Sequence, residues 1–133
     1  SHVPIRKTMP QFSAFTSIQA AGDTARGRIT PNGAGTFYGQ AVGGSGAGQS
    51  IHLRWTGTPT GTFTLWYTNK KDPDFTTDTD WTQDTSSTLA NPAGAAGSTF
   101  MDTFNSNARL RRVKYVNASG AGVIEGEFDT RGY

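Results

Sequence analysis

The chain has 133 residues, enough for one domain, and its formal net charge is only +2. So weak a charge argues against a dedicated nucleic-acid binder, which needs a clustered basic surface to displace counterions. The absence of cysteine excludes a disulfide framework and a thiolate metal site. Only 34% of the residues are hydrophobic and 17 are glycine, which favours an all-β domain rich in turns.

The sequence predicts two parts, an extended N-terminal arm over residues 1–10 and a single β-sandwich domain over residues 11–133. Pro4 and Pro10 disfavour helix and bias the residues before them toward extended backbone. A frayed terminus is the simpler interpretation, and an arm that becomes ordered on a neighbouring subunit is the alternative. The arm residues that we would assign to such a contact are Val3, Pro4, Ile5, Arg6, Lys7 and Met9.

Short strands are expected over residues 11–20, 24–30 and 36–42, separated by Gly-containing turns. Arg26 and Arg28 charge one face of the second of these, which is typical of an edge strand. Residues 43–48 are Gly-rich and invite comparison with a phosphate-binding loop. A Walker loop continues with Lys-Ser/Thr and a helix, whereas a strand is expected here, so the sequence favours a plain connection.

The strongest pattern in the chain covers residues 49–69, where two alternating runs flank a polar connection. The apolar positions are Ile51, Leu53 and Trp55 in the first run, then Phe63, Leu65 and Tyr67 in the second. Period-two alternation is the mark of a half-buried strand. The connection over residues 56–61 contains two glycines and a proline, so the pattern predicts a β-hairpin. Trp66 falls on its polar face.

An acidic stretch follows over residues 70–84. Its carboxylates are Asp72, Asp74, Asp78, Asp80 and Asp84. Acids two residues apart could ligate calcium through oxygen, but the central Gly and final Glu of an EF-hand loop are missing. The sequence therefore favours a solvated loop, ending at Trp81, which should pack inward at the start of a strand. We expect no metal and no other cofactor.

The next two segments are less decisive. Residues 85–98 are rich in small and polar side chains and indicate a long connection, with a short strand around Thr88-Leu89. Residues 99–104 fit either a strand or a single helical turn.

The C-terminal residues predict a second hairpin, with strands over 108–117 and 122–130 and a turn at 118–121. Its expected register pairs are Asn117 with Gly122, Lys114 with Glu125, and Arg112 with Glu127. Opposite charges that face each other across strands stabilise by about 0.2–1 kcal/mol per pair. The basic run therefore indicates a salt-bridged sheet face rather than a nucleic-acid patch. Its members are Arg109, Arg111, Arg112 and Lys114.

Catalytic motifs are not apparent. The two histidines, His2 and His52, have no partners at metal-ligand spacing, and no G-x-S-x-G elbow occurs. The sequence predicts that the protein is not an enzyme. No apolar run is long enough for a signal peptide or a membrane span, so we expect cytoplasmic synthesis and no membrane partner. About eight short strands with Gly-rich turns predict an antiparallel β-sandwich of jelly-roll type.

Two blocks of the sequence resemble small structural proteins of tailed bacteriophages. The first is residues 55–69, WTGTPTGTFTLWYTN, followed by an acidic loop that ends in Asp80-Trp81. The second is residues 112–120, RVKYVNASG, which is similar to their closing strand and turn. The resemblance covers residues 55–128, and the N-terminal half shows no match. Thr68 stands where those proteins usually carry Ser.

The resemblance implies a virion component made in the host bacterium's cytoplasm, and best a capsid decoration or cement protein on the capsid surface. Such proteins sit over joints between major capsid protein subunits, make no direct nucleic-acid contact and oppose expansion of the head. A dimer or trimer is expected because capsid joints lie on symmetry axes. Outside the arm, we assign Trp66, Asp72 and Asp74 to the contact. The alternative is a tail- or head-fibre module that binds host glycan through Tyr38, Trp66 or Trp81.

Overall fold

The computed structural model describes residues 11–13, 28–43, 49–86, 89–95, 97–104 and 107–130. These ranges contain strands and loops and no helix, which confirms the all-β prediction. The strands are β1 (Gln11–Ser13), β2 (Arg28–Ile29), β3 (Gly35–Tyr38), β4 (Val42–Gly43), β5 (Gln49–Gly57), β6 (Thr60–Thr68), β7 (Thr82–Gln83), β8 (Ser98–Phe104), β9 (Leu110–Ser119) and β10 (Gly122–Thr130). Within the described ranges, no helix has the length and apolar character needed to cross a membrane.

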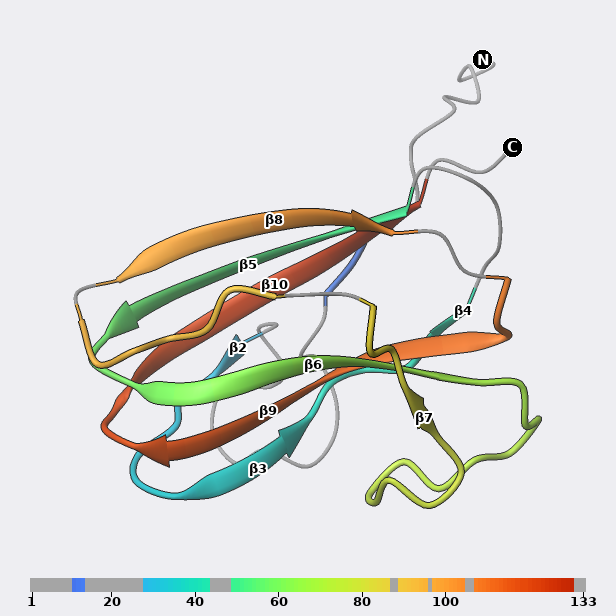
Figure 1. Cartoon of the computed structure of the whole chain (residues 1–133), viewed down its shortest axis with the longest axis horizontal. Helices are drawn as coiled ribbons and strands as arrows, with labels where there is room; N and C mark the ends of the chain where they lie inside the picture. The colour runs from blue at the N-terminus through green and yellow to red at the C-terminus, as the bar shows by residue number, and fades with distance from the viewer. Residues whose placement is uncertain are drawn as a thin grey trace, which may run out of the picture.

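The strands form two antiparallel sheets that stack as two layers (Figure 1). The β5 sheet has the order β1-β10-β5-β8, and β2 also pairs with β10. The β6 sheet has the order β3-β9-β6-β7, and β4 also pairs with β9. The predicted antiparallel sandwich is thus confirmed, with ten strands among the described residues in place of the expected eight or so.

Strand pairing is nested along the chain. The outermost strands β1 and β2 pair with β10, and β3 and β4 pair with β9. Further in, β5 pairs with β8, and at the centre β6 pairs with β7. The chain therefore runs as one long double strand that is folded over itself, and its successive pairs fall alternately in the two sheets.

The hairpin predicted over residues 49–69 is wrong in its pairing, although both strands exist. β5 pairs with β10 and β8, whereas β6 pairs with β9 and β7 in the opposite sheet. Only Thr58 and Pro59 lie between β5 and β6. A two-residue hairpin needs positive φ at one or both of these positions, usually from Gly or Asn, and a proline φ is fixed near −65°. The chain instead steps from one sheet to the other.

The second predicted hairpin is also wrong in its pairing, because β9 and β10 belong to opposite sheets. Gly122 pairs with Gly57, and Asn117 pairs with Gly35 and Gly61. The expected pairing of Arg112 with Glu127 does not form; Glu127 instead accepts a bidentate ion pair from Arg54, at 2.6 and 2.7 Å. The alternation of apolar and polar residues identifies the buried face of these strands, but it does not identify the strand that is the neighbour in the sheet.

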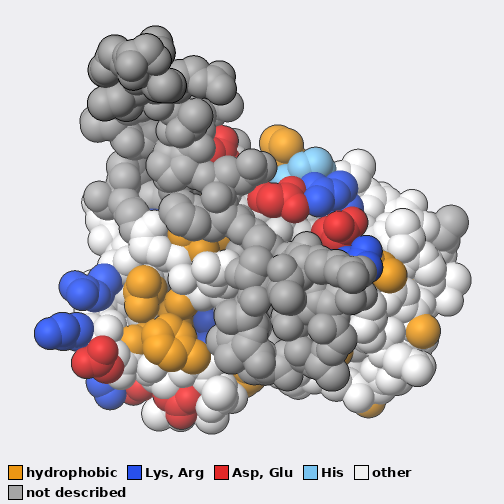
Figure 2. Space-filling view, turned by 180° about the vertical axis from the view of Figure 1, so that it is seen from behind, with side chains coloured by type: hydrophobic (Ala, Val, Ile, Leu, Met, Phe, Trp, Pro, Cys, Tyr) orange, Lys and Arg blue, Asp and Glu red, His pale blue; other side chains and the backbone are white. Residues whose placement is uncertain are grey.

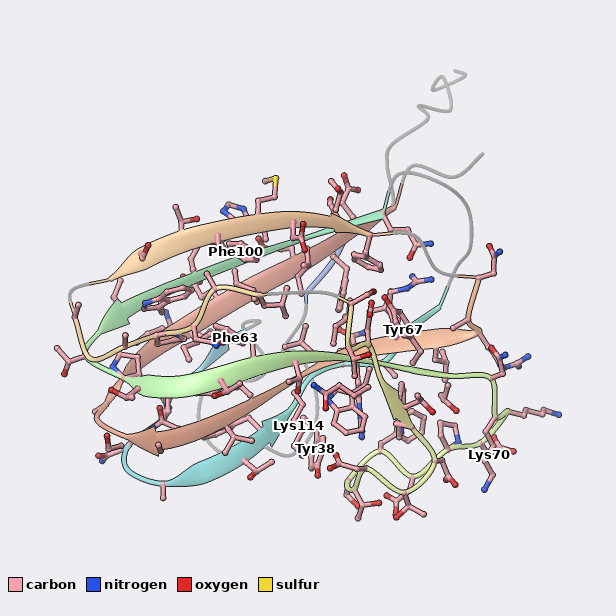
Figure 3. All side chains as sticks on the ribbon, in the orientation of Figure 1. Tyr38, Phe63, Tyr67, Lys70, Phe100 and Lys114 are labelled. Atoms are coloured by element: carbon pink, nitrogen blue, oxygen red, sulfur yellow. The ribbon has the colours of Figure 1, made fainter. Side chains whose placement is uncertain are left out.

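The core lies between the two sheets and is built from the inward positions of the four longest strands. Leu53 on β5, Val113 and Tyr115 on β9, and Ile124 and Phe128 on β10 are fully buried. Burying each of these side chains stabilises the fold by about 1.5–3 kcal/mol. Figure 3 shows Phe63 reaching from β6 into the same interior. Five of the six apolar positions predicted over residues 49–69 lie in this core, and the sixth, Tyr67, is partly buried and packs against it.

The two steps between sheets meet at one end of the sandwich. The Thr58 amide of the β5–β6 connection donates to the Ala121 carbonyl of the β9–β10 connection at 3.0 Å, so the two connections are hydrogen-bonded to each other. Asn117 is buried there; its side-chain amide donates to the Gly33 carbonyl at 2.7 Å and to that of Gly120 at 3.0 Å. Its oxygen accepts from the Tyr115 hydroxyl, and burial raises the pKa of Tyr115 to about 12. These contacts give the Tyr-x-Asn block a structural role.

Three less decisive predictions also have outcomes. The expected strand over residues 36–42 divides into β3 and β4, and residues 99–104 form a strand, β8. Leu89 is buried in the core but does not belong to a strand. Residues 1–10, 14–27, 44–48 and 87–88 lie outside the described residues, so the predicted arm, the Gly-rich connection and most of the first two predicted strands stay predictions.

Candidate functional site

The acidic stretch forms a loop that folds over the outer face of the β6 sheet, and we call residues 70–81 the clamped loop. Its anchor is Arg112 on β9, whose neighbour Val113 points into the core, so that Arg112 points outward. The guanidinium lies between two rings, with its central carbon 4.4 Å from the Tyr38 centroid and 4.1 Å from that of Trp81. This stack buries Arg112 completely.

The same guanidinium binds the loop backbone. It donates to the carbonyl of Phe75 at 2.9 Å and to that of Thr77 through its other terminal nitrogen. Desolvation lowers the pKa of Arg112 from its usual value, yet an arginine keeps its charge in proteins. Two charge-assisted bonds and two ring contacts from one side chain fix the position of the loop on the sheet.

Lys114, one outward position along β9, adds a second contact. Its ammonium lies 2.7 Å from an Asp78 carboxylate oxygen and 5.3 Å from the Trp66 ring. Burial, together with a hydrogen bond to Asp78, raises the pKa of Tyr38. Figure 3 shows Tyr38 and Lys114 side by side on the face of the β6 sheet that turns away from the other layer. Two members of the predicted basic run, Arg112 and Lys114, therefore bind the loop rather than β10, whereas Arg111 is buried and donates to the Gly43 carbonyl.

Contacts within the loop complete the clamp. Asp80 accepts from the Asp74 amide at 2.8 Å and from the Lys70 ammonium at 3.2 Å, which lowers its pKa. Asp74 accepts from the amide and hydroxyl of Thr76, and these bonds lower its pKa as well. The Trp81 indole N–H donates to the Asp74 carbonyl at 2.8 Å. Trp81 is buried, as the sequence predicts, but it packs against Arg112 on the outer face of the β6 sheet and not in the core between the sheets.

The loop presents a mixed surface to solvent. Lys70, Lys71 and Asp72 are exposed, and Phe75 keeps 39% of its surface accessible while its ring packs edge-on against Trp81. Figure 2 shows hydrophobic side chains bordered by basic and acidic ones at the end of the molecule that carries this loop. Sequence reasoning missed Phe75; an aromatic residue isolated in a polar stretch was the available signal.

The predicted site residues fare differently. The six arm residues lie outside the described ranges, and Asp72 is exposed on the clamped loop. Asp74 lies on the same loop but holds its backbone. Trp66 is half-buried, and its indole N–H donates to Thr64 at 2.7 Å. Among the described residues, no group of three or more His, Cys, Asp or Glu is placed to hold a metal ion.

A second polar cluster lies on the outer face of the β5 sheet (Figure 2). Arg54 forms the bidentate pair with Glu127, and these hydrogen bonds raise the pKa of Arg54. His52 bonds the Thr99 hydroxyl at 2.7 Å and lies 3.3 Å from an Arg54 nitrogen. The cluster ties β8, β5 and β10 together across the sheet, a structural arrangement.

Compared with models of known protein families and with curated proteins, this sequence matches none. The features of the chain that bear on its function are the strand order, the clamped loop and the two sequence blocks at residues 55–69 and 112–120.

Proposed function

We propose that this protein is a capsid decoration protein of a tailed bacteriophage, bound over joints between major capsid protein subunits. The observation that carries the proposal is the nested strand pairing. Two antiparallel sheets with this nested strand order support a jelly-roll topology, and jelly rolls are common in viral capsid and lectin domains. Of these two classes, the phage-like blocks at residues 55–69 and 112–120 favour the viral capsid protein over the lectin.

The clamped loop supplies a surface suited to such a contact. A loop that is already fixed loses little conformational entropy when it binds, so little of the free energy of its contacts is offset and most of it contributes to affinity. Phe75 is a partly exposed aromatic side chain on a loop that also carries the exposed Lys71 and Asp72, a composition that suits an anchor residue with a polar rim. A decoration protein needs such rigid contacts and no catalytic group.

Modest contacts are sufficient in this role. A protein that joins several capsid subunits, and that associates with itself, gains avidity from patches that are individually weak. The predicted arm, residues 1–10, would add a further contact of this kind. The protein would thus act as a clip whose combined contacts oppose separation of the subunits.

The glycan-binding alternative has less support in the geometry. A sugar platform needs an open aromatic face, but Trp81 is buried beneath Arg112, and Tyr38 meets the same guanidinium. Trp66 is half-buried with Lys114 over its ring. Each of the three aromatic residues considered from sequence thus has a basic side chain over its ring, and Tyr38 and Trp66 keep only part of their surface accessible.

Binding to decoration-free capsids tests the proposal. We expect the wild-type chain to co-sediment with the capsids, and Phe75→Ala to weaken binding about tenfold or more, as for an interface anchor. Val116→Ala is the matched control, because Val116 is equally exposed but belongs to strand β9 and not to the loop. Removal of residues 1–10 should weaken binding independently.

Failure of the wild-type chain to bind these capsids, together with retention on host-cell polysaccharide that Trp66→Ala abolishes, would replace the proposal by the fibre-module alternative. Binding of Phe75→Ala that is as strong as that of the wild type would leave the decoration role but remove the clamped loop from the interface.

A further inference from the structure

The four edges of the two sheets differ in length. β1 and β2 divide one edge of the β5 sheet into short pieces, and β3 and β4 do the same in the β6 sheet. The other edge of the β6 sheet is the two-residue β7, extended by an isolated bridge between Thr60 and Ala93. β8 is different: it is seven residues long, and among the described residues only β5 pairs with it. Short edges are protected against pairing with other chains, and long straight ones are not.

β8 also lacks the side chains that usually protect an edge. Its sequence, STFMDTF, has no Lys, Arg or Pro and only one charge, on Asp102. Met101 is 63% exposed at the middle of the strand, the most exposed large hydrophobic side chain among the described residues. Figure 1 shows β8 along the border of its layer. An exposed, apolar-centred edge of this length is a template for adding a strand.

The backbone groups available on the open side can be identified. The Thr103 amide donates to the Asp102 carboxylate of its own strand at 2.9 Å, so this amide points away from β5. Backbone groups alternate between the two sides of an antiparallel strand. The amides and carbonyls of Thr99 and Met101 therefore open to the same side as those of Thr103, in a regular row.

We propose that this row pairs with β8 of a second copy of the chain, antiparallel about a twofold axis through Met101. This register overlaps the whole strand and sets Thr99 opposite the partner's Thr103. The three pairs make about six backbone hydrogen bonds, two of them after each Thr103 amide exchanges the Asp102 carboxylate for the partner strand. It brings the two Met101 side chains together and places each Asp102 opposite a Phe100, so that like charges do not face each other. The two β5 sheets become one continuous sheet.

A second copy fits this edge better than an unrelated peptide because the strand complements itself. A twofold interface requires one surface to satisfy its own copy, and β8 has its apolar residue at the centre with a threonine two positions away on either side. The β8 edge would be the surface through which the chain associates with itself, as the proposed function includes. The test of this edge uses the purified chain without capsids, so the two proposals fail separately.

Sedimentation equilibrium of the purified chain is the first test. We expect a dimer in the micromolar range and a dissociation constant raised about tenfold or more by Met101→Lys, because like charges would meet at the axis. Val116→Lys is the matched control, since it adds the same charge to the outer face of a central strand of the β6 sheet. A wild-type chain that stays monomeric at high micromolar concentration overturns the proposal.

Cysteine cross-linking tests the register, since the chain has no cysteine of its own. Met101→Cys should form a disulfide-linked dimer on mild oxidation, because the two Cα atoms would lie about 5.5 Å apart. Thr99→Cys should not, since its two copies would lie about 14 Å apart along the paired strands. Cross-linking of Met101→Cys no faster than that of Val116→Cys would contradict the interface even if a dimer exists.

Discussion

Arg112 shows how one side chain can fix a loop. It joins strand β9 to the clamped loop through two rings and two carbonyls, and lysine could reproduce neither the planar stack nor the forked pair of bonds. We therefore expect Arg112→Lys to reduce the free energy of unfolding by about 2–4 kcal/mol. Urea denaturation followed by tryptophan fluorescence measures this change.

Arg109→Lys is the control for this substitution. Arg109 lies next to β9 and is exposed, so its replacement by lysine should change stability by no more than about 0.5 kcal/mol. Similar losses in the two variants would mean that the stack on Arg112 contributes little to the fold.

The aspartates of the clamped loop predict a response to acid. Hydrogen bonds lower the pKa of Asp74 and of Asp80 below the usual 3.8, so both carboxylates bind protons more readily once the loop opens. Their stabilising contribution is complete above about pH 4 and is lost as the pH falls through the lowered pKa values. The Trp81 indole N–H signal in NMR spectra should report the opening.

Asp80→Asn should make that opening less steep with pH, because one of the two titrating groups is removed. Asp72→Asn changes an exposed residue of the same loop and should leave the profile as in the wild type. An indole signal that is unaffected down to pH 2 would show that these two carboxylates do not hold the loop.

At the scale of elements, strand existence could be predicted and strand partnership could not. Alternation identifies the buried face of β5 from Ile51, Leu53 and Trp55, and burial follows it. Partnership depends on the connections, and the composition of both short connections also fits hairpin turns. Thr58-Pro59 contains the evidence against a hairpin, because a proline at this point does not fit the tight turns that join neighbouring strands.

Gly120 tests the step from β9 to β10. Its φ is +81°, and a Cβ there would meet the Thr58 carbonyl of the other connection. Gly33 has a φ of +79° but open space around it. Gly33→Ala should cost about 1–2 kcal/mol from backbone strain alone, and Gly120→Ala about 1–2 kcal/mol more from crowding. Urea midpoints of the two variants give the comparison.

Equal midpoints for the two alanine variants would mean that the connections do not approach each other as closely as the structure places them. The pair is informative because the left-handed conformation is common to both sites, and only the neighbour differs.

For the whole molecule, composition and alternation were sufficient to predict an antiparallel sandwich, and the aromatic core positions followed. The clamped loop could not be predicted from the sequence, because its position depends on Arg112, which is 31 residues after Trp81. The sequence pattern instead predicts that Arg112 pairs with Glu127. The acidic stretch therefore looked solvated although most of its carboxylates bind the protein itself. Contacts between distant residues leave no local pattern.

The proposed role is most directly tested by cryo-electron microscopy of the phage particle that carries this chain. We expect density for the sandwich on the outside of the head, over joints between major capsid protein subunits, with the clamped loop facing the capsid. Density confined to the tail or to fibres, with none on the head, would contradict it.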